Sequence, residues 1–357
     1  MNENIPKYPL SYLYFNPHFS GASRFDAQRD GSLYTPDMLK KAYGFPENRD
    51  ASGMRVAVIS AFDDGEVIEN LRTFTNEFGL EMPKVNLHYP NGKPIAVSRS
   101  WQIETALDTQ WLSVFAPKAE IDVVFSKTAL LDDMVFAVRY AVTIGAHCIA
   151  MCFGTREFAS QEEMSAVFEN SSSIFVCSSG DNGGIVEFPS SSPHVLSVGG
   201  TRLILDGNSK IISETVWQNS GGGSSRIFTI PDFQKSFVPS LEKMRSSPDV
   251  AFSADLFPGA AVFVSSLGGW TNAGGTSLGC ACVTGICTLI KKYNQSIDST
   301  RDLQNFLYVK AGQEGYDIPQ FNFRDIVIGQ SGDFTAKEGW DFCTGLGSLR
   351  IGRFLLK

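Results

Sequence analysis

The sequence contains no apolar run that approaches the roughly 20 residues needed to cross a bilayer, and its first ten residues lack the basic and then apolar pattern of a secretory signal. It also lacks an excess of positive charge, since 30 Lys and Arg stand against 38 Asp and Glu and give a formal net charge of −8. Proteins that bind nucleic acid usually neutralise its phosphates with a basic surface. We therefore expect a globular protein that binds neither a membrane nor nucleic acid.

The 357 residues include seven cysteines but no CxxC pair, and no cluster of Cys and His has the spacing of a zinc site. Six cysteines lie inside apolar runs, which predicts that they are buried as small hydrophobic side chains: Cys148, Cys152, Cys177, Cys280, Cys282 and Cys287. Because the number is odd, at least one thiol is unpaired, and an unpaired thiol favours a reducing compartment.

The alternation of apolar runs and helical stretches predicts an α/β fold. The runs typical of buried strands lie at 54–60, 121–125, 148–152, 174–177 and 195–198. The helical stretches lie at 67–78, 100–115, 132–144, 161–170 and 276–293. Strands that alternate with helices indicate a mostly parallel central sheet with helices on both faces. No repeat or linker marks a boundary, so we predict a single domain over 1–357, with an irregular N-terminal wrap over 1–50 and a glycine-rich, loop-like tail over 313–347.

Two acidic residues lie on the aromatic side of the predicted helix at 100–115. At about 100° per residue, Glu104 and Asp108 fall in one stripe with aromatic side chains, and the neutral polar residues Gln102, Thr105, Thr109 and Ser113 lie opposite. An Asp/Glu pair at i, i+4 usually marks a solvated face. Here neutral residues already supply a face suited to solvent. We therefore expect Glu104 and Asp108 to titrate as a coupled pair suited to general acid/base chemistry.

Two glycine-rich segments add a hydroxyl and a third carboxylate. Ser277 follows two glycines and precedes an apolar run, so it falls at a helix N-terminus, where it is either an N-capping residue or a nucleophile beside an oxyanion-binding amide. Asp181 lies in the segment 179–184, which follows the predicted strand 174–177. Open α/β sheets place ligand sites at this end of their strands, although Ser-Gly-Asp-Asn-Gly by itself is an ordinary turn.

Taken together and in this order, these segments resemble the sedolisins, a family of serine-carboxyl peptidases with a subtilisin-like fold. The resemblance extends over most of the chain from about Met54 onward, through Glu104–Asp108 with Ala116–Ala119, Ser179–Asp181, Phe188–Pro193, Val198–Thr201, Gly221–Gly223, Pro248–Val250, Gly275–Ser277, Gly339–Asp341 and Thr344–Gly347. Similarity to one motif arises easily by chance, whereas similarity to a series of motifs in order does not.

The resemblance implies a role for each of the four polar residues. Ser277 would be the nucleophile, Glu104 the base that takes its proton, Asp108 the partner of Glu104, and Asp181 an acid in the oxyanion hole. A carboxyl group can donate a hydrogen bond to an oxyanion only in its neutral form, whereas a base must be ionised, so we expect an acid-shifted, bell-shaped pH profile. No His lies in the sequence context of a subtilisin base, so Ser-His-Asp chemistry is not expected.

The resemblance also implies how substrate and metal are bound. Cys152, Phe153 and Gly154 and the segment Ser220, Gly221 and Gly222 look like the two backbone segments that flank an extended peptide, to which the glycines would give close access. The tail looks like a site for one calcium ion, with Asp325 and Asp341 as carboxylate ligands and Ile326, Lys337 and Gly339 as carbonyl ligands.

The prediction is therefore an acid-acting, calcium-stabilised serine-carboxyl endopeptidase that acts as a monomer on peptides or unfolded proteins. Two alternatives stay open: a catalytically silent, peptidase-like protein that binds peptides, and a tripeptidyl exopeptidase. The sequence begins close to the catalytic domain, so we expect no prodomain. For the compartment, the resemblance implies an acidic extracellular or lysosome-like space, whereas the missing signal and the unpaired thiols favour the cytoplasm.

Overall fold

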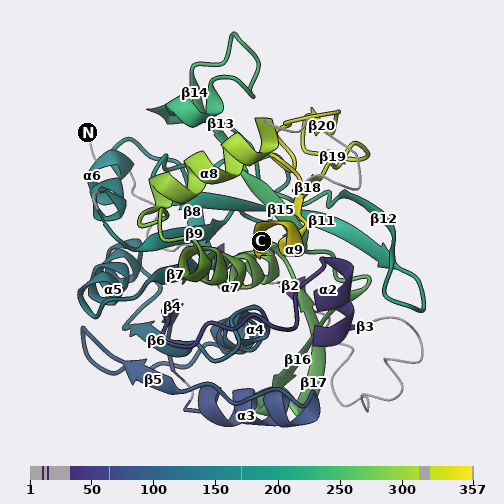
Figure 1. Cartoon of the computed structure of the whole chain (residues 1–357). Helices are drawn as coiled ribbons and strands as arrows, with labels where there is room; N and C mark the ends of the chain where they lie inside the picture. The colour runs from purple at the N-terminus through teal and green to yellow at the C-terminus, as the bar shows by residue number, and fades with distance from the viewer. Residues whose placement is uncertain are drawn as a thin grey trace.

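A central sheet of ten strands positions the rest of the molecule (Figure 1). The computed structural model describes residues 10–11, 14–15, 33–63, 65–169, 171–312 and 322–355. Along the sheet the order is β18 (Phe323–Arg324), β21 (Ser348–Leu349), β15 (Val250–Ser253), β11 (Leu196–Leu205), β9 (Ile174–Ser178), β7 (Cys148–Met151), β4 (Arg55–Ala61), β6 (Glu120–Ser126) and β5 (Val85–His88). The tenth strand, β12 (Ile211–Val216), pairs with β11. The strands from β21 to β5 are parallel, which confirms the predicted sheet.

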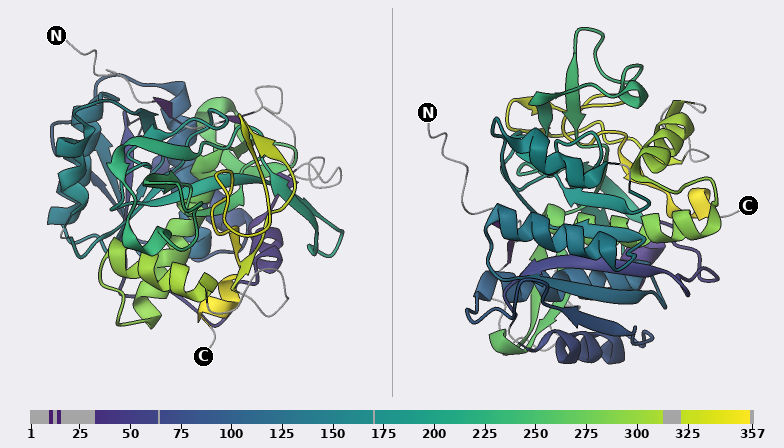
Figure 2. Two further views of the ribbon diagram at one scale, coloured as in Figure 1. Left: turned by 90° about the horizontal axis from the view of Figure 1, so that it is seen from above. Right: turned by 90° about the vertical axis from the view of Figure 1, so that its left-hand side faces the viewer.

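Helices cover both faces of this sheet (Figure 2). Side chains alternate along β4, so that Val56 and Val58 enter the core that contains α4 (Arg99–Phe115) and α7 (Thr276–Tyr293). Ala57 and Ile59 enter the core that contains α5 (Leu131–Thr143). Four of the predicted helices are confirmed within one residue at either end: α3 (Val67–Glu77), α4, α5 and α7. The fifth is shorter, with α6 (Gln161–Ser165) followed by a 3-10 turn over Ala166–Phe168.

Small sheets that the periodicity did not predict surround the ends of the central strands. One contains β2 (Tyr14–Phe15), β17 (Gly269–Gly274), β16 (Gly259–Val264) and β3 (Leu33–Tyr34). A second contains β1 (Leu10–Ser11), β8 (Phe153–Arg156) and β10 (Glu187–Phe188), and two-stranded sheets pair β13 (Gly223–Thr229) with β14 (Met244–Ser247) and β19 (Gln330–Ser331) with β20 (Phe334–Thr335). Three of these pairings, β1 with β8, β2 with β17 and β3 with β16, join segments more than a hundred residues apart in the sequence.

Two expectations about the ends of the chain need correction. Within 1–50, the described part is not irregular, because α2 (Pro36–Ala42) begins with a proline in its first turn and ends with two lysines, both favourable for a helix. Of the tail over 313–347, residues 313–321 lie outside the described residues, and β18, β19 and β20 interrupt the rest. Two further helices, α8 (Thr300–Gly312) and α9 (Ile351–Leu355), were not predicted. None of the described helices is both long and apolar enough to cross a membrane.

Helix α4 is buried on almost every side. Gln110 donates to the Phe263 carbonyl at 2.8 Å, and the Trp111 indole donates to the Ala261 carbonyl at 3.0 Å, which ties α4 to β16. The side opposite Glu104, which seemed suited to solvent, is also buried: Thr105 and Thr109 bond backward to carbonyls of their own helix, at 2.7 Å each. The sequence pattern missed this because short hydroxyl side chains can be buried once a helix carbonyl accepts their proton.

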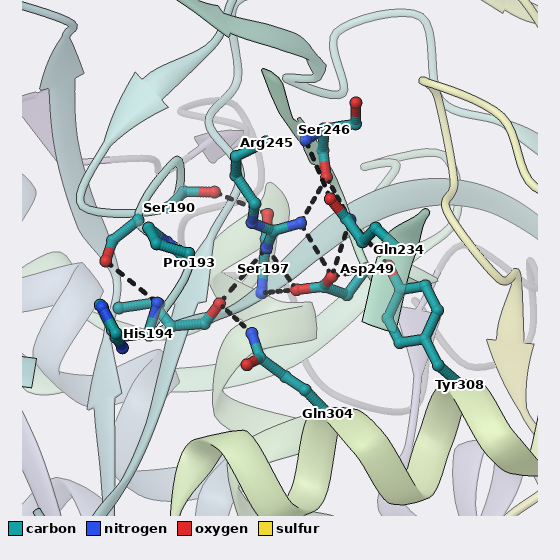
Figure 3. A network of polar contacts seen from close by, with 12 residues as sticks. Ser190, Pro193, His194, Ser197, Gln234, Arg245, Ser246, Asp249, Gln304 and Tyr308 are labelled. Atoms are coloured by element: carbon teal, nitrogen blue, oxygen red, sulfur yellow. Dashed lines mark hydrogen bonds and ion pairs between the residues drawn. The ribbon is translucent and has the colours of Figure 1, made fainter. Parts of the chain in front are cut away.

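A buried polar network fastens β14 and α8 to the central sheet (Figure 3). The guanidinium of Arg245 and the carboxylate of Asp249 are both fully buried and lie 2.6 Å apart. Asp249 also accepts the Ser197 N–H at 2.8 Å and the Tyr308 hydroxyl at 2.8 Å, and Gln234 donates to the Tyr308 oxygen at 2.9 Å. These bonds join Arg245 of β14, Ser197 of β11 and Tyr308 of α8 through Asp249, so the network connects β14 and α8 to the central sheet.

Helices α4 and α7 cross so closely that one glycine is required at the contact. A Cβ atom at Gly285 would lie 2.8 Å from the carbonyl carbon of Phe115 and 3.0 Å from the backbone nitrogen of Ala116. Backbone atoms cannot move aside as a flexible side chain can. The separation of the two helices therefore depends on Gly285.

We expect Gly285→Ala to destabilise the protein by about 1–3 kcal/mol, because overpacking at the crossing outweighs the better helix propensity of alanine. Denaturant unfolding measures this free energy. Gly207→Ala is the matched control, since no atom lies within 4 Å of a Cβ built at that turn. Equal free energies of unfolding for the two variants would contradict the prediction.

Candidate active site

The two acidic residues of α4 meet a thiol inside the molecule. Glu104 and Asp108 are 0% and 1% exposed, and one oxygen of each lies within 4.8 Å of the other and of the Cys152 sulfur, which follows β7. The Cys152 thiol lies 3.6 Å from the Ser277 carbonyl oxygen. Within the described part of the chain, no carboxyl oxygen of Glu104 or Asp108 makes a hydrogen bond of regular geometry. The pair is thus enclosed together, as the sequence predicted.

Burial raises the pKa of each of the two carboxyl groups well above the ordinary value for its residue type. For Glu104 the loss of water raises the pKa most, the charges of Asp108 and Asp181 raise it further, and an interaction with the Ser277 side chain lowers it. For Asp108 the loss of water again dominates, and Cys152 lowers the pKa. Since two adjacent carboxylates repel each other, the first proton that this pair binds is held tightly.

Ser277 lies in the first turn of α7. The preceding Gly275 is the N-cap and has φ +90°, a conformation that residues other than glycine rarely adopt. This turn directs the chain from β17 into the helix and brings Ser277, 0% exposed, beside Glu104. The first N–H groups of a helix have no partner within the helix, so this end attracts negative charge.

Asp181 reaches the same helix end. Its Oδ1 accepts the backbone N–H of Thr276 at 2.9 Å and the Thr276 hydroxyl at 2.7 Å, while the Thr276 hydroxyl oxygen accepts the Gly180 N–H at 3.2 Å. Its Oδ2 is buried and has no hydrogen-bond partner among the described residues. Burial raises the pKa of Asp181 to about 7, although both Thr276 bonds oppose the rise. Near neutral pH a substantial fraction of Asp181 is therefore protonated.

A fourth carboxyl group, which the sequence analysis missed, lies beside the Asp181 loop. Glu187 begins β10, is 2% exposed, and accepts the Asn182 amide at 2.7 Å. Burial raises the pKa of Glu187 to about 8. A Cβ at Gly180 would lie 3.0 Å from the Glu187 carboxyl carbon, so glycine lets the loop approach this group. No periodicity marks a single acid before an aromatic residue, so Glu187 could not be identified from the sequence.

The first predicted substrate segment forms the start of β8. Phe153 and Gly154 are the first residues of β8, and Cys152 precedes them. One edge of β8 pairs with β10, and the other pairs antiparallel with β1, with Leu10 opposite Gly154 and Ser11 opposite Phe153. This edge therefore accepts an extended antiparallel strand, which here comes from the chain itself.

The second predicted segment lies against the Asp181 loop, with a different role for its glycines. The Gly221 N–H donates to the Gly180 carbonyl at 2.6 Å, and the Gly222 N–H donates to the Ile185 carbonyl at 3.1 Å. A Cβ on Gly221 would collide with the Ser179 backbone. These glycines therefore admit the chain's own backbone, and close access for a peptide at this segment stays a prediction.

The predicted calcium ligands lie together in the tail. Asp325 Oδ2 accepts the Gly339 N–H at 2.8 Å, and Asp341 Oδ2 accepts the Lys337 N–H at 3.1 Å. Asp341 Oδ1 also accepts the N–H groups of Cys343 and Thr344, at 2.8 and 2.9 Å. Burial raises the pKa of Asp341, and no Lys or Arg of the described ranges pairs with it. Two buried carboxylates joined through the turn over 337–341 offer the oxygen ligands that calcium prefers.

Known proteins resemble this chain over most of its length. A model of the Subtilase family matches residues 105–345. Kumamolisin from Bacillus sp. (strain MN-32) is 30% identical, in an alignment that covers 95% of this chain and 67% of kumamolisin. The chain belongs to the sedolisin family. It is thus an enzyme of the serine-type peptidase class.

Other members of the sedolisin family match over shorter stretches. Sedolisin from Pseudomonas sp. (strain 101) and xanthomonalisin from Xanthomonas sp. (strain T-22) are each 30% identical over 47% of this chain, which corresponds to 29% and 22% of their own lengths. Among solved structures, the Pseudomonas sedolisin complex with two molecules of pseudo-iodotyrostatin has a TM-score of 0.78 and 23% identity, and the alignment covers 91% of this chain and 97% of that one. This likeness confirms the subtilisin-like fold.

The raised pKa of Asp181 predicts how the stability of this sedolisin-family chain changes with pH. A carboxyl group whose pKa is raised in the folded state favours folding while it is protonated, and this contribution is lost as pH rises from about 4 to about 7. Asp181→Asn removes the titration. The free energy of unfolding of the variant minus that of the wild type should therefore increase between pH 4 and pH 8, by at most about 4 kcal/mol.

Denaturant unfolding of both proteins at the two pH values measures this difference. Asp333→Asn, at an exposed turn, is the control and should keep a constant difference from the wild type. A constant difference for Asp181→Asn as well would show that Asp181 is ionised in the folded protein throughout.

Proposed function

We propose that this protein is an acid-acting serine-carboxyl endopeptidase that cleaves peptides or unfolded proteins with Ser277 as nucleophile. The observation that carries the proposal is the meeting of three buried groups at the start of α7: the Ser277 side chain interacts with Glu104, and Asp181 bonds to Thr276, the residue before the nucleophile. Three carboxyl groups are buried around Ser277, and none of them pairs with a Lys or Arg among the described residues. Such burial is costly for folding, so a role limited to folding would not require it.

In the proposed reaction, Ser277 Oγ attacks the carbonyl carbon of the scissile bond as Glu104 takes the hydroxyl proton. Neutral Asp181 donates a hydrogen bond from Oδ2 to the oxyanion that forms, and the helix N-terminus stabilises the same charge. When the acyl-enzyme forms, Glu104 gives its proton to the leaving amine. A water molecule then attacks the acyl carbon as Glu104 takes one of its protons, and Glu104 returns this proton to Ser277 Oγ as the bond between Oγ and the acyl carbon breaks and the acid product leaves. Asp108 supports Glu104 by sharing the proton of the pair.

The substrate would bind as an extended strand along the edge of β8. The pairing of β1 with Phe153 and Gly154 supports this proposal, since it gives the direction and register that a bound peptide could take. The Ser220–Gly222 segment would contribute indirectly, because its bonds to Gly180 and Ile185 fix the loop that carries Asp181. An endopeptidase needs a cleft that admits residues on both sides of the scissile bond.

The tail would hold one calcium ion through Asp325 and Asp341, with the carbonyls of Ile326, Lys337 and Gly339. When bound, the ion supplies positive charge that neutralises two buried carboxylates. The N–H groups of Lys337 and Gly339 already connect the two acids, so the cation would fix the turn over 337–341. Its proposed role is structural.

The chemistry is tested with a denatured protein substrate between about pH 3 and pH 8, followed by mass spectrometry of the products. We expect Ser277→Ala and Glu104→Gln each to lose activity by a factor of at least about 10³. Internal cleavage would distinguish an endopeptidase from an enzyme that removes tripeptides from the N-terminus. A folded wild-type protein that binds the substrate without cleaving it would favour the catalytically silent alternative.

The role of Asp181 predicts a specific change in the pH profile. Wild-type kcat/KM should decline as pH rises through about 7, because ionised Asp181 can no longer donate a hydrogen bond to the oxyanion. Asp181→Asn keeps a donor at the same position at every pH, so its profile should lack this decline while the acid limb of Glu104 remains. An unchanged alkaline limb in Asp181→Asn would exclude Asp181 from the oxyanion site.

The calcium site is tested by thermal unfolding with a chelator and with added calcium. At a calcium concentration 100 times the dissociation constant, the bound ion should stabilise the wild type by about 2.7 kcal/mol. Asp341→Asn should abolish the response, whereas Asp333→Asn should retain it. A melting temperature that is equal with chelator and with calcium would contradict the proposal.

A further inference from the structure

We propose that Glu104, Asp108 and Cys152 form a binding site for one thiophilic divalent cation such as Zn²⁺, and that this ion inhibits the peptidase. The binding site is defined by the side chains alone, whereas the inhibition rests on the proposed function of Glu104. This site is separate from the proposed calcium site, whose donors are all oxygen atoms.

The three donors come from two elements that the fold holds rigidly together. Glu104 and Asp108 lie one turn apart on α4, and Cys152 follows β7, directly before β8. The sulfur and one oxygen of each carboxyl group all lie within 4.8 Å of one another. Side-chain rotation can bring such atoms to the distances of about 2.0–2.3 Å that zinc requires.

A second observation shows that these side chains are available to a ligand. All four carboxyl oxygens are buried and have no hydrogen bond of regular geometry among the residues described, and no Lys or Arg of those ranges pairs with them. Buried carboxyl oxygens are normally bonded, since an unsatisfied polar atom costs free energy. A divalent cation would satisfy these atoms and neutralise both charges at once.

The donor set selects the kind of ion. Calcium and magnesium prefer oxygen ligands, and magnesium also gives up its bound water molecules reluctantly. Zinc, in contrast, accepts sulfur and carboxylate oxygen in the same site. Three protein donors leave one tetrahedral position for a water molecule. Binding releases the thiol proton and any carboxyl protons to solvent, and neither oxidation nor a change in covalent bonds within the protein is required.

Inhibition follows from the use of Glu104 as a ligand. Zinc withdraws electron density from a carboxylate that coordinates it and lowers its basicity, so Glu104 no longer takes the Ser277 proton in the proposed reaction. The bound ion also lies next to Ser277, since the Cys152 thiol is 3.6 Å from the Ser277 carbonyl. Because all three donors are buried, the ion enters only when the site opens locally, and incubation must continue to equilibrium.

The test combines inhibition with a direct measurement of binding. Zn²⁺ is titrated into the wild type and into Cys152→Ser, which keeps a small polar side chain but loses the sulfur ligand. The control is Cys287→Ser, which removes another buried thiol from α7. Binding is measured by competition with a chromophoric chelator in a Ser277→Ala background, which has no activity to lose. Cd²⁺ replaces Zn²⁺ in a parallel titration, because its thiolate complexes absorb in the ultraviolet.

We expect one ion per chain, ultraviolet absorption from a cadmium–thiolate bond, and inhibition that a chelator reverses. Cys152→Ser should bind zinc at least about tenfold more weakly. Loss of a residue that only hydrogen-bonds to a metal ligand already lowers metal affinity by about tenfold or more, and Cys152 is itself a ligand. Equal zinc affinity in wild type and Cys152→Ser, or a loss of affinity in Cys287→Ser as large as in Cys152→Ser, would overturn the site. Zinc binding at Cys152 in a protein without peptidase activity would uphold the site and reject the proposed function.

Discussion

The burial of two carboxyl groups side by side between α4, α7 and the sheet is the constraint on which the rest of the site depends. Neither Glu104 nor Asp108 has a cationic partner among the described residues, so the pair is tolerated only by holding a proton or by binding a cation. The close crossing at Gly285 and the bonds from α4 to β16 fix the position of these groups. The same enclosure that makes the pair costly raises the pKa of Glu104, which would suit the base role proposed for it.

The elements that carry the proposed chemistry were largely predictable from the sequence. Helices α4 and α7 lie within one residue of their predicted bounds, because helical periodicity marks α4, and a preceding glycine and a long apolar run mark α7. The juxtaposition of Glu104, Asp181 and Ser277 could not be derived from periodicity, since the residues lie on three separate segments. It followed from the family resemblance, which contains information on distant contacts that one segment does not.

The sequence failed where structure depends on pairing between distant strands. Strands β1, β2 and β3 are two residues long, and their partners lie more than a hundred residues away. The sequence also did not reveal that the glycines at 221 and 222 are required for contact with other backbone segments of the chain. Glu187 was missed for a different reason, because only the local folding of the loop brings its carboxyl group to Gly180 and Asn182.

The pairing of β1 with β8 has a consequence for the apparent affinity of the cleft. A strand has two edges, and those of β8 are occupied by β10 and by Leu10–Ser11 of the same chain. A peptide that takes the second edge competes with a tethered strand whose local concentration is unaffected by dilution. The observed dissociation constant is then the intrinsic constant divided by the fraction of molecules in which the edge is open. The peptide concentration at half-saturation therefore depends on Leu10 and Ser11 as much as on the edge of β8.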